Sequence, residues 1–339
     1  MHRIPSHSEL LQHIRSIEDA AAPWRDPGQT RTSGGPGSRA GTTTDPPTLP
    51  QVTVSMPAYR SGEFIRVAIA SVLLQQGVDL ELIVVDDGSP DGTADIVRSI
   101  PDARIRLIRN AKRMGIGHCH NLAVAASRAP VIIHVDSDDL ILPGALSAMV
   151  QALARSSRNG QAYCDFVHLD KAARITPEEL HRQVAFLSRH RKGLTDIRRA
   201  LLVHGMVVGH LRTYRRSALE EVGPFDETLR YGVDYEMALR LAECYEFERV
   251  PRVLYCQRVH GDNTQATLRM APIRFWWNRV RICRRHLRRR EGAVLGYRRL
   301  ELAGVLASSL AHALEIPKLA KGILRPLARM APLPRRDRP

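Results

Sequence analysis

From residue 51 onward, short apolar runs alternate with longer amphipathic stretches, and this alternation restricts the folds open to the chain more than any other feature. Apolar runs of four or five residues bounded by turn residues predict buried strands, whereas apolar residues three and four apart predict helices. Strands are expected at 52–56, 82–85, 105–108 and 131–135, and helices between them at 63–75, 93–100 and 117–127. Elements that alternate in this way form a mainly parallel central sheet flanked by helices, so we expect an α/β fold.

Composition divides the 339 residues into four regions. Residues 1–27 carry apolar side chains at helical spacing and predict a short helix. Residues 28–50 are rich in Gly, Pro, Thr and Ser and predict a disordered linker. The α/β pattern occupies residues 51–262, which form the expected folded domain. Residues 263–339 are basic with apolar residues at helical spacing, and predict a helical amphipathic extension.

The formal net charge of +15 comes from this C-terminal extension. Residues 263–339 carry 18 Lys and Arg against 4 Asp and Glu, whereas residues 51–262 carry 27 against 26. A nucleic-acid-binding domain would concentrate its basic side chains on the folded part. We therefore expect no nucleic-acid partner, although a nucleic-acid-binding protein that uses the Arg-rich extension is the alternative.

The cysteines and the chain's start bear on the compartment. Five scattered cysteines contain no C-x-x-C pair, so they predict reduced thiols and neither a disulfide framework nor a zinc site. The first residues lack the apolar core of a signal peptide, and no run of about 18 apolar residues occurs. These features favour a cytoplasmic protein that does not span a membrane by itself.

Acidic residues follow two of the predicted strands. Asp86 and Asp87 come after the second strand, and Asp136, Asp138 and Asp139 follow the fourth. Because the carboxyl ends of parallel strands share one edge of a sheet, we expect these side chains to gather there. Clustered carboxylates repel one another unless a cation lies among them, and Mn²⁺ or Mg²⁺ suits oxygen ligands. The alternative is that these residues only form turns and helix caps.

Five segments, in a consistent order over residues 51–262, resemble glycosyltransferase family 2. They are 52–59 (VTVSMPAY), 83–89 (IVVDDGS), 136–139 (DSDD), 222–226 (VGPFD) and 234–241 (DYEMALRL). The resemblance implies a GT-A catalytic domain that transfers a sugar from a nucleotide-sugar donor with inversion at the anomeric carbon and the help of Mn²⁺ or Mg²⁺. It also implies a carbohydrate, lipid-linked or other hydroxyl acceptor. UDP is the expected nucleotide, with dTDP and GDP left open.

Carried over residue by residue, the resemblance assigns a donor site and a metal site. The residues matching the nucleotide-binding positions are Pro57, Ala58, Tyr59, Asp86, Asp87, Arg113, Asp136 and Asp138. Those matching or lying near the metal-binding positions are Asp138, Asp139 and His260. Which of the three aspartates ligates the metal directly is left open, and a purely structural role is the alternative for His260.

The acceptor side is expected between residues 206 and 241. A strand at 206–214 and a helix at 218–222 precede the turn at 223–226, which resembles the acceptor region of the family. Asp234 matches the catalytic base, although Val233 stands where the family often has Glu. A role as helix N-cap is the alternative for Asp234. Gln257 and Arg258 lack the following Trp of processive synthases, so a single transfer is expected.

The extension itself suggests a membrane surface. Residues 269–299 contain 11 Arg against one Glu, with Trp276 and Trp277 among them. A basic amphipathic helix with interfacial tryptophans predicts peripheral attachment to the anionic inner face of the membrane. The alternative is a helix whose aromatic residues pack on the catalytic domain. A metal-dependent nucleotide-sugar phosphohydrolase is a further alternative, although the sequence has neither a His-rich metal set nor a Walker-type phosphate loop.

Overall fold

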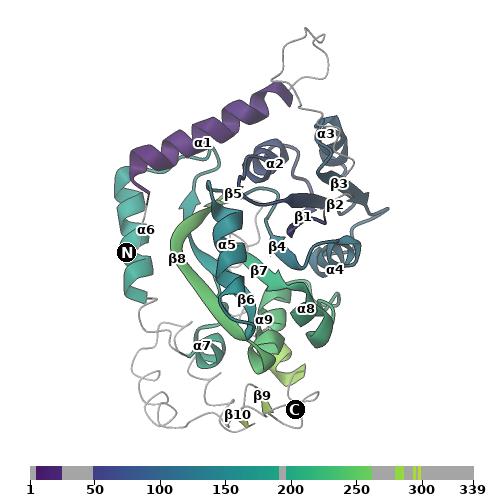
Figure 1. The fold of residues 1–339 in the computed structure, drawn as a ribbon, viewed down its shortest axis with the longest axis vertical. Coiled ribbons are helices and arrows are strands. Elements are labelled where there is room, and N and C mark those ends of the chain that lie inside the picture. The colour runs from purple at the N-terminus through teal and green to yellow at the C-terminus, as the bar shows by residue number, and fades with distance from the viewer. Residues whose placement is uncertain are drawn as a thin grey trace.

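The computed structural model describes residues 5–24, 49–190, 196–261, 279–285, 293–294 and 297–298, and its centre is an eight-stranded sheet in the order β3-β2-β1-β4-β7-β6-β8-β5 (Figure 1). The strands of this sheet are β1 (Val52–Ala58), β2 (Leu80–Asp86), β3 (Ile105–Arg109), β4 (Val131–His134), β5 (Leu140–Ile141), β6 (Asn159–Leu169), β7 (His210–Arg215) and β8 (Glu246–Arg258). The helices are α1 (His7–Ala21), α2 (Ile65–Leu73), α3 (Thr93–Ser99), α4 (Ile116–Ala126), α5 (Ala145–Ala154), α6 (Pro177–His190), α7 (Ile197–His204), α8 (Arg216–Val222) and α9 (Val233–Cys244). A helix also covers residues 279–285.

One half of the sheet, from β3 to β4, is wholly parallel, as the alternating pattern predicts. Every residue of β2 is buried, and its side chains alternate between two helical layers. Leu82 and Val84 share a core with α2, whereas Ile83 and Val85 pack against α4. A strand covered on both faces in this way reads as a continuous apolar run, which is why the sequence identifies it clearly.

The other half of the sheet is mixed. β7 pairs antiparallel with both β4 and β6, β6 pairs parallel with β8, and the short β5 pairs antiparallel with the end of β8. The β5 pairing places Leu140 opposite Cys256 and Ile141 opposite Tyr255. It therefore brings the acidic segment 136–139 beside the last residues of β8.

The N-terminal helix packs on this domain. Ser6 and Glu9 form a capping box at the start of α1. The Ser6 side chain accepts a hydrogen bond from the Glu9 amide, and the Glu9 side chain accepts one from the Ser6 amide. Leu10, Ile14 and Ile17 form its buried face and share a core with residues of α2, β5 and β6. In Figure 1 this helix runs from α6 across the end of the sheet toward α2 and α3.

Two expectations from the sequence need correction. The strand expected at 206–214 is shorter and begins at His210, because residues 205–209 connect it to α7. The helix expected across 269–299 is wrong at its end, where β9 (Ala293–Val294) pairs antiparallel with β10 (Tyr297–Arg298). Gly292 and Gly296 disfavour a helix there. Most of the predicted linker at 28–50, and Trp276 and Trp277, lie outside the described residues.

Among the described helices, none is both long and apolar enough to cross a bilayer.

Candidate active site

The candidate site lies at the carboxyl ends of β1, β2 and β4, where the two halves of the sheet meet. Asp86 is the last residue of β2, and Asp136 follows β4 by two residues. The strand pairing opposes Asp86 to Ala58 of β1, so the predicted nucleotide-binding segment 57–59 lies next to the Asp86–Asp87 pair. The chain therefore gathers its predicted donor residues at one edge, as the parallel topology requires.

Asp87 fixes the loop that follows β3. One of its carboxylate oxygens accepts hydrogen bonds from the Asn110 side chain and the Met114 amide, and the other accepts from the Gly115 amide, each at 2.8 Å. Gly88 allows this close approach, because its φ is +69° and a Cβ atom there would lie 2.9 Å from the Lys112 backbone. Both oxygens of Asp87 thus have partners within the protein, and its contact with a donor stays a prediction.

Asp86 is fully buried beside Arg109. The guanidinium Nε lies 3.1 Å from the Asp86 carboxylate, and the Ser89 amide donates to its other oxygen at 3.2 Å. The charge of Asp86 is therefore balanced by a cation of the neighbouring strand β3.

The loop shaped by Asp87 brings two predicted donor residues together. The Arg113 guanidinium lies 4.1 Å from the centre of the Tyr59 ring, within the range of a cation–π contact. Arg60 approaches the same ring at 5.5 Å. The Tyr59 ring is thus surrounded by positively charged side chains, which suits an anionic nucleotide.

A second acidic group follows β4. The Asp139 side chain is buried and accepts hydrogen bonds from the Tyr255 hydroxyl at 2.7 Å and from the Arg258 amide at 2.8 Å. The Tyr255 hydroxyl also accepts from the Asp136 amide at 3.2 Å. Next to this pair, an Asp138 carboxylate oxygen lies 2.9 Å from His260 Nε2. β8 therefore supplies the side chains that support the acidic segment.

Two carboxylates of this second group, those of Asp136 and Asp139, resist ionisation. Burial, together with the charges of Asp138 and Asp234, raises the pKa of Asp136 to about 6, although Arg212 opposes the shift. Burial and the charges of Asp138 and Asp136 raise the pKa of Asp139 well above its usual range. Ionising both carboxylates at neutral pH therefore costs free energy in the protein alone, and a cation between them would recover it.

The residues present fit a divalent cation. Ligand atoms of Asp136, Asp139 and His210 lie within 4.8 Å of one another. Carboxylate and imidazole ligands suit Mn²⁺, and carboxylates suit Mg²⁺. His210 was missed in the sequence, because only the antiparallel pairing of β7 places it here. Of the predicted metal ligands, Asp139 accepts hydrogen bonds from Tyr255 and Arg258, whereas Asp138 pairs with His260. Metal binding by this set of three residues stays a prediction.

Asp234 lies in the first turn of α9, near enough to this cluster for its charge to raise the pKa of Asp136. The helix is capped by Gly232, whose φ is +76°, so the expected alternative role of Asp234 as N-cap is wrong. The Arg212 guanidinium lies 3.1 Å from the Asp234 carboxylate. Burial disfavours the charge of Arg212, but the nearby carboxylates of Asp234 and Asp136 outweigh this effect and raise its pKa. Arg212 thus forms an ion pair with Asp234 and also interacts with the charge of Asp136.

Two buried histidine rings lie close to Arg212. The buried rings of His120 and His134 stack with their centres 3.7 Å apart. Burial lowers the pKa of His120 to about 3 and that of His134 well below its ordinary value, with Arg212 contributing in both cases. Both are neutral at physiological pH, and in the sequence they are two isolated histidines that no motif connects.

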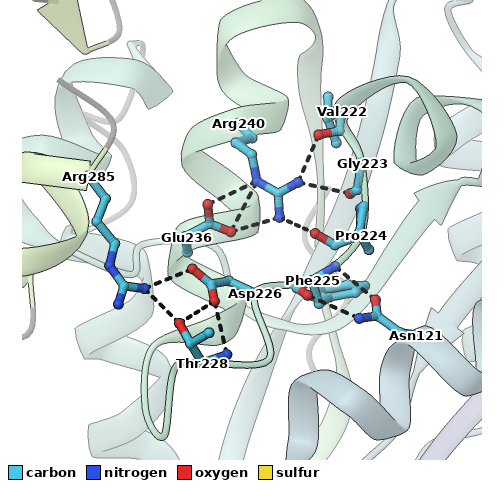
Figure 2. A network of polar contacts seen from close by, with 10 residues as sticks. All are labelled: Asn121, Val222, Gly223, Pro224, Phe225, Asp226, Thr228, Glu236, Arg240 and Arg285. Carbon is cyan, nitrogen blue, oxygen red and sulfur yellow. Dashed lines mark hydrogen bonds and ion pairs between the residues drawn. The ribbon is translucent and has the colours of Figure 1, made fainter. Parts of the chain in front are cut away.

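The turn at 222–226 is held from behind by two residues (Figure 2). The Arg240 guanidinium donates to the carbonyls of Val222, Gly223 and Pro224, each at 2.8 Å, and forms a buried ion pair with Glu236 at 2.7 Å. The Asn121 side chain of α4 pairs with the backbone amide and carbonyl of Phe225. α4 and α9 thereby fix the turn between them.

Comparisons with known proteins agree on one family. The model of "Glycosyl transferase family 2" matches residues 53–223. The chondroitin synthase of Escherichia coli is 28% identical over 218 residues, which cover 64% of this chain and 30% of that synthase. The succinoglycan biosynthesis protein ExoO of Rhizobium meliloti is 32% identical over 212 residues, 58% of this chain and 57% of ExoO. This chain thus spans less than a third of the chondroitin synthase.

Solved structures share the fold. The mannosyltransferase PcManGT from Pyrobaculum calidifontis, in complex with GDP-Man and Mn²⁺, aligns with a TM-score of 0.57 at 21% identity over 96% of this chain and 85% of its own. TarS 1–349 from S. aureus, in complex with UDP-GlcNAc, aligns with a TM-score of 0.57 at 16% identity over 82% of this chain and 80% of its own.

Proposed function

Because this chain belongs to glycosyltransferase family 2, we propose that it transfers one sugar from a nucleoside-diphosphate sugar to an acceptor hydroxyl, with inversion at the anomeric carbon. The family resemblance and the expected GT-A fold are confirmed. The relatives support a role in the biosynthesis of polysaccharides or the cell envelope. They give no support to the alternatives of a nucleic-acid-binding protein or a phosphohydrolase.

The donor is proposed to lie across the parallel half of the sheet. Tyr59 and Arg113 form a cation–π pair at its edge, suited to cover a nucleobase beside the segment Pro57–Ala58. UDP-GlcNAc and GDP-Man were bound to the two fold neighbours, and of these nucleotides we propose UDP. The screen described below tests the proposed nucleotide and identifies the sugar.

A divalent cation is proposed to be held by Asp136 and Asp139 with His210, beside the Asp138–His260 pair. When bound, Mn²⁺ or Mg²⁺ neutralises the diphosphate and stabilises the departing nucleotide. The raised pKa values of Asp136 and Asp139 support this assignment, because they mark carboxylates that need a positive partner. The Mn²⁺ in the mannosyltransferase neighbour agrees with it.

Asp234 is proposed as the general base. Its carboxylate is about one-third exposed and faces the cluster, so an acceptor hydroxyl can reach it. The Arg212 guanidinium holds it in one orientation. Val233, which replaces the family's usual Glu, is buried in the apolar core and anchors the start of α9. The acidic neighbour of the family pattern is thus absent, and an arginine from β7 supports the base in its place.

These residues account for a single displacement. The acceptor oxygen attacks the anomeric carbon from the face opposite the nucleotide, and Asp234 accepts its proton as the new bond forms. The bond to the nucleotide breaks in the same step, through an oxocarbenium-like state, so the configuration inverts. The observation that carries the proposal is that Asp234 pairs with Arg212, whose charge also interacts with Asp136 of the acidic cluster.

A two-stage experiment tests the function. UDP, GDP and dTDP sugars are first screened by thermal shift with and without Mn²⁺, and the best donor is then assayed with a panel of p-nitrophenyl glycosides. We expect cation-dependent stabilisation by one class of donor and a glycosylated product whose anomeric configuration, read by NMR, is inverted. Stabilisation by none of the donors in either condition would refute the proposal, and release of free sugar without transfer would favour the hydrolase.

Peripheral attachment to the inner face of the membrane through residues 269–299 is proposed separately. On the helix at 279–285, Arg279, Ile282 and Cys283 are buried on the domain, whereas Arg281 is exposed. Only the exposed residues of this helix can therefore meet anionic headgroups. Flotation of the full chain with vesicles of phosphatidylglycerol and phosphatidylcholine tests the idea; absence from the floating fraction at low salt would reject it.

A further inference from the structure

The beginning of the C-terminal extension is built into the acceptor side of the domain. Ile282 and Cys283 of the helix at 279–285 are fully buried and belong to the same apolar core as α9. This core also contains Val233 and Tyr235, the two neighbours of Asp234 in the sequence. The helix therefore packs directly behind the turn of α9 that carries the proposed base.

Each end of this helix makes polar contacts with a different element. At its start, the Arg279 guanidinium donates to the carbonyl of Leu202 in α7 and lies 5.8 Å from the centre of the Tyr235 ring. At its end, the Arg285 guanidinium lies 2.9 Å from both the Asp226 carboxylate and the Thr228 hydroxyl. Figure 2 shows Arg285 approaching Asp226 from the side opposite Asn121.

Arg285 holds residues 226 and 228 at the end of the acceptor turn, between which His118 and Asn121 of α4 hold the Glu227 side chain. Arg240 binds the carbonyls at 222–224, and Asn121 binds the backbone of Phe225. Residues 226–228 come next. There, one Asp226 oxygen accepts from the amide and hydroxyl of Thr228, and Arg285 approaches the other oxygen and the same hydroxyl.

We propose that Arg285 is a positioning residue of the acceptor site, through which the C-terminal extension sets the shape of residues 226–228 and thereby the affinity for the acceptor. The proposal rests on the proposed function, because it takes this turn as the acceptor side. Donor binding belongs to the parallel half and does not depend on Arg285. The extension is then a working part of the active site.

Steady-state kinetics test the proposal, with the best nucleotide-sugar and the best p-nitrophenyl glycoside from the screen. We expect R285Q to raise the acceptor KM about tenfold, the size of effect that a small misplacement produces, while the donor KM and kcat change less than about twofold. R285K, which keeps the charge, should recover part of the affinity. R155Q is the matched control, because it removes an exposed ion pair of the same type, with Glu248, far from the turn.

Asp226 provides a second variant. D226N should raise the acceptor KM as R285Q does, and the double variant should be no worse than either single change, since both remove the same contact. Equal acceptor KM values for R285Q, R155Q and the wild type would overturn the proposal. So would a rise in donor KM as large as the rise in acceptor KM, because it would indicate a general loss of structure.

Hydrogen–deuterium exchange gives a readout that needs no substrate. The amides of residues 226–228 should exchange faster in R285Q than in the wild type or R155Q, with β1 and β2 unchanged. If the wild type transfers to no acceptor, the proposed function fails while this measurement still decides whether Arg285 orders the turn. If transfer is robust and exchange at 226–228 is unchanged in R285Q, the positioning role alone is wrong.

Discussion

The two halves of the sheet hold their acidic side chains in different ways. In the parallel half, Asp87 accepts hydrogen bonds from two backbone amides and one side-chain amide, and Asp86 faces Arg109. In the mixed half, Asp136 and Asp139 lie close to each other, share the Tyr255 hydroxyl, and have raised pKa values. One group has its partners within the protein, whereas the other has too few.

This difference follows from topology. Parallel strands end in loops that run side by side, so the loop at 110–115 can offer its amides to Asp87. In the mixed half, the acidic segment meets the antiparallel end of β8, which contributes a few side chains and one amide. The parallel half thus balances its acidic side chains without a ligand, whereas the mixed half holds the cluster for which we propose the positive charge of a bound cation.

Removing that charge should have the largest effect. Asp139→Ala, or excess EDTA on the wild type, should abolish transfer, a loss of at least about 10³-fold, because a bound cation contributes several kcal/mol to the leaving group. Rates of product formation by chromatography measure it, and added Mn²⁺ should restore the EDTA-treated enzyme. Asp95→Asn, an exposed carboxylate of α3, is the control. Full activity in EDTA would show that the mixed half needs no cation, and the proposed difference between the two halves would then be wrong.

Asp234→Asn should rank second. The amide cannot accept a proton, so kcat should fall about 10²- to 10⁴-fold while the donor still binds. Donor affinity is measured by calorimetry in Mn²⁺ and turnover by the transfer assay. An unchanged kcat would mean that another residue is the general base.

Asp87→Asn should instead affect the parallel half through stability. The amide nitrogen of Asn would face a backbone N–H, so the free energy of unfolding should fall by about 1–3 kcal/mol. In a chain of this size, each kcal/mol lowers Tm by about 2–4 °C. Differential scanning calorimetry checks this, with the stabilisation by Mn²⁺ expected to match the wild type. A loss of Mn²⁺ binding at unchanged Tm would contradict the division of roles.

The smallest effect concerns pH. The pKa of Asp136 is raised to about 6 in the folded protein against about 3.9 in an unfolded chain, so folding favours the protonated form. Without metal, this group should therefore lower stability as pH rises from 4 to 6, and the cost should persist above pH 6. Stabilisation by Mn²⁺ should be greater by a few degrees in Tm at pH 7 than at pH 5. Equal shifts at both pH values would indicate that the cation binds elsewhere.

The sequence predicts the parallel half better than the mixed half for a physical reason. β1, β2 and β4 are short, pair with near neighbours in the sheet and are mostly buried, so their apolar runs are evident in the sequence. β6 and β8 span 11 and 13 residues, and their partners lie far along the chain. No local pattern specifies that register. Neither strand could therefore be predicted from the sequence.

The candidate site divides in the same manner. The aspartates at strand ends were found because the motif is contiguous, and Tyr59 and Arg113 were both named although their contact was not. His210, Tyr255 and Arg212 were missed, since each reaches the site only through the pairing of β7 or β8. Arg285, for which we propose a role in positioning the turn, lies in a segment that the sequence pattern interprets as a membrane-facing tail.

The position of Arg285 also bears on how the protein is made. Asp226 and Arg285 are separated by 59 residues, so the ribosome must add that stretch after the turn before the two can meet. At roughly 5–20 residues per second, this interval lasts on the order of several seconds. The nascent chain can therefore bury the core of its parallel half early, whereas the contact between Asp226 and Arg285 forms only after residue 285 has been added.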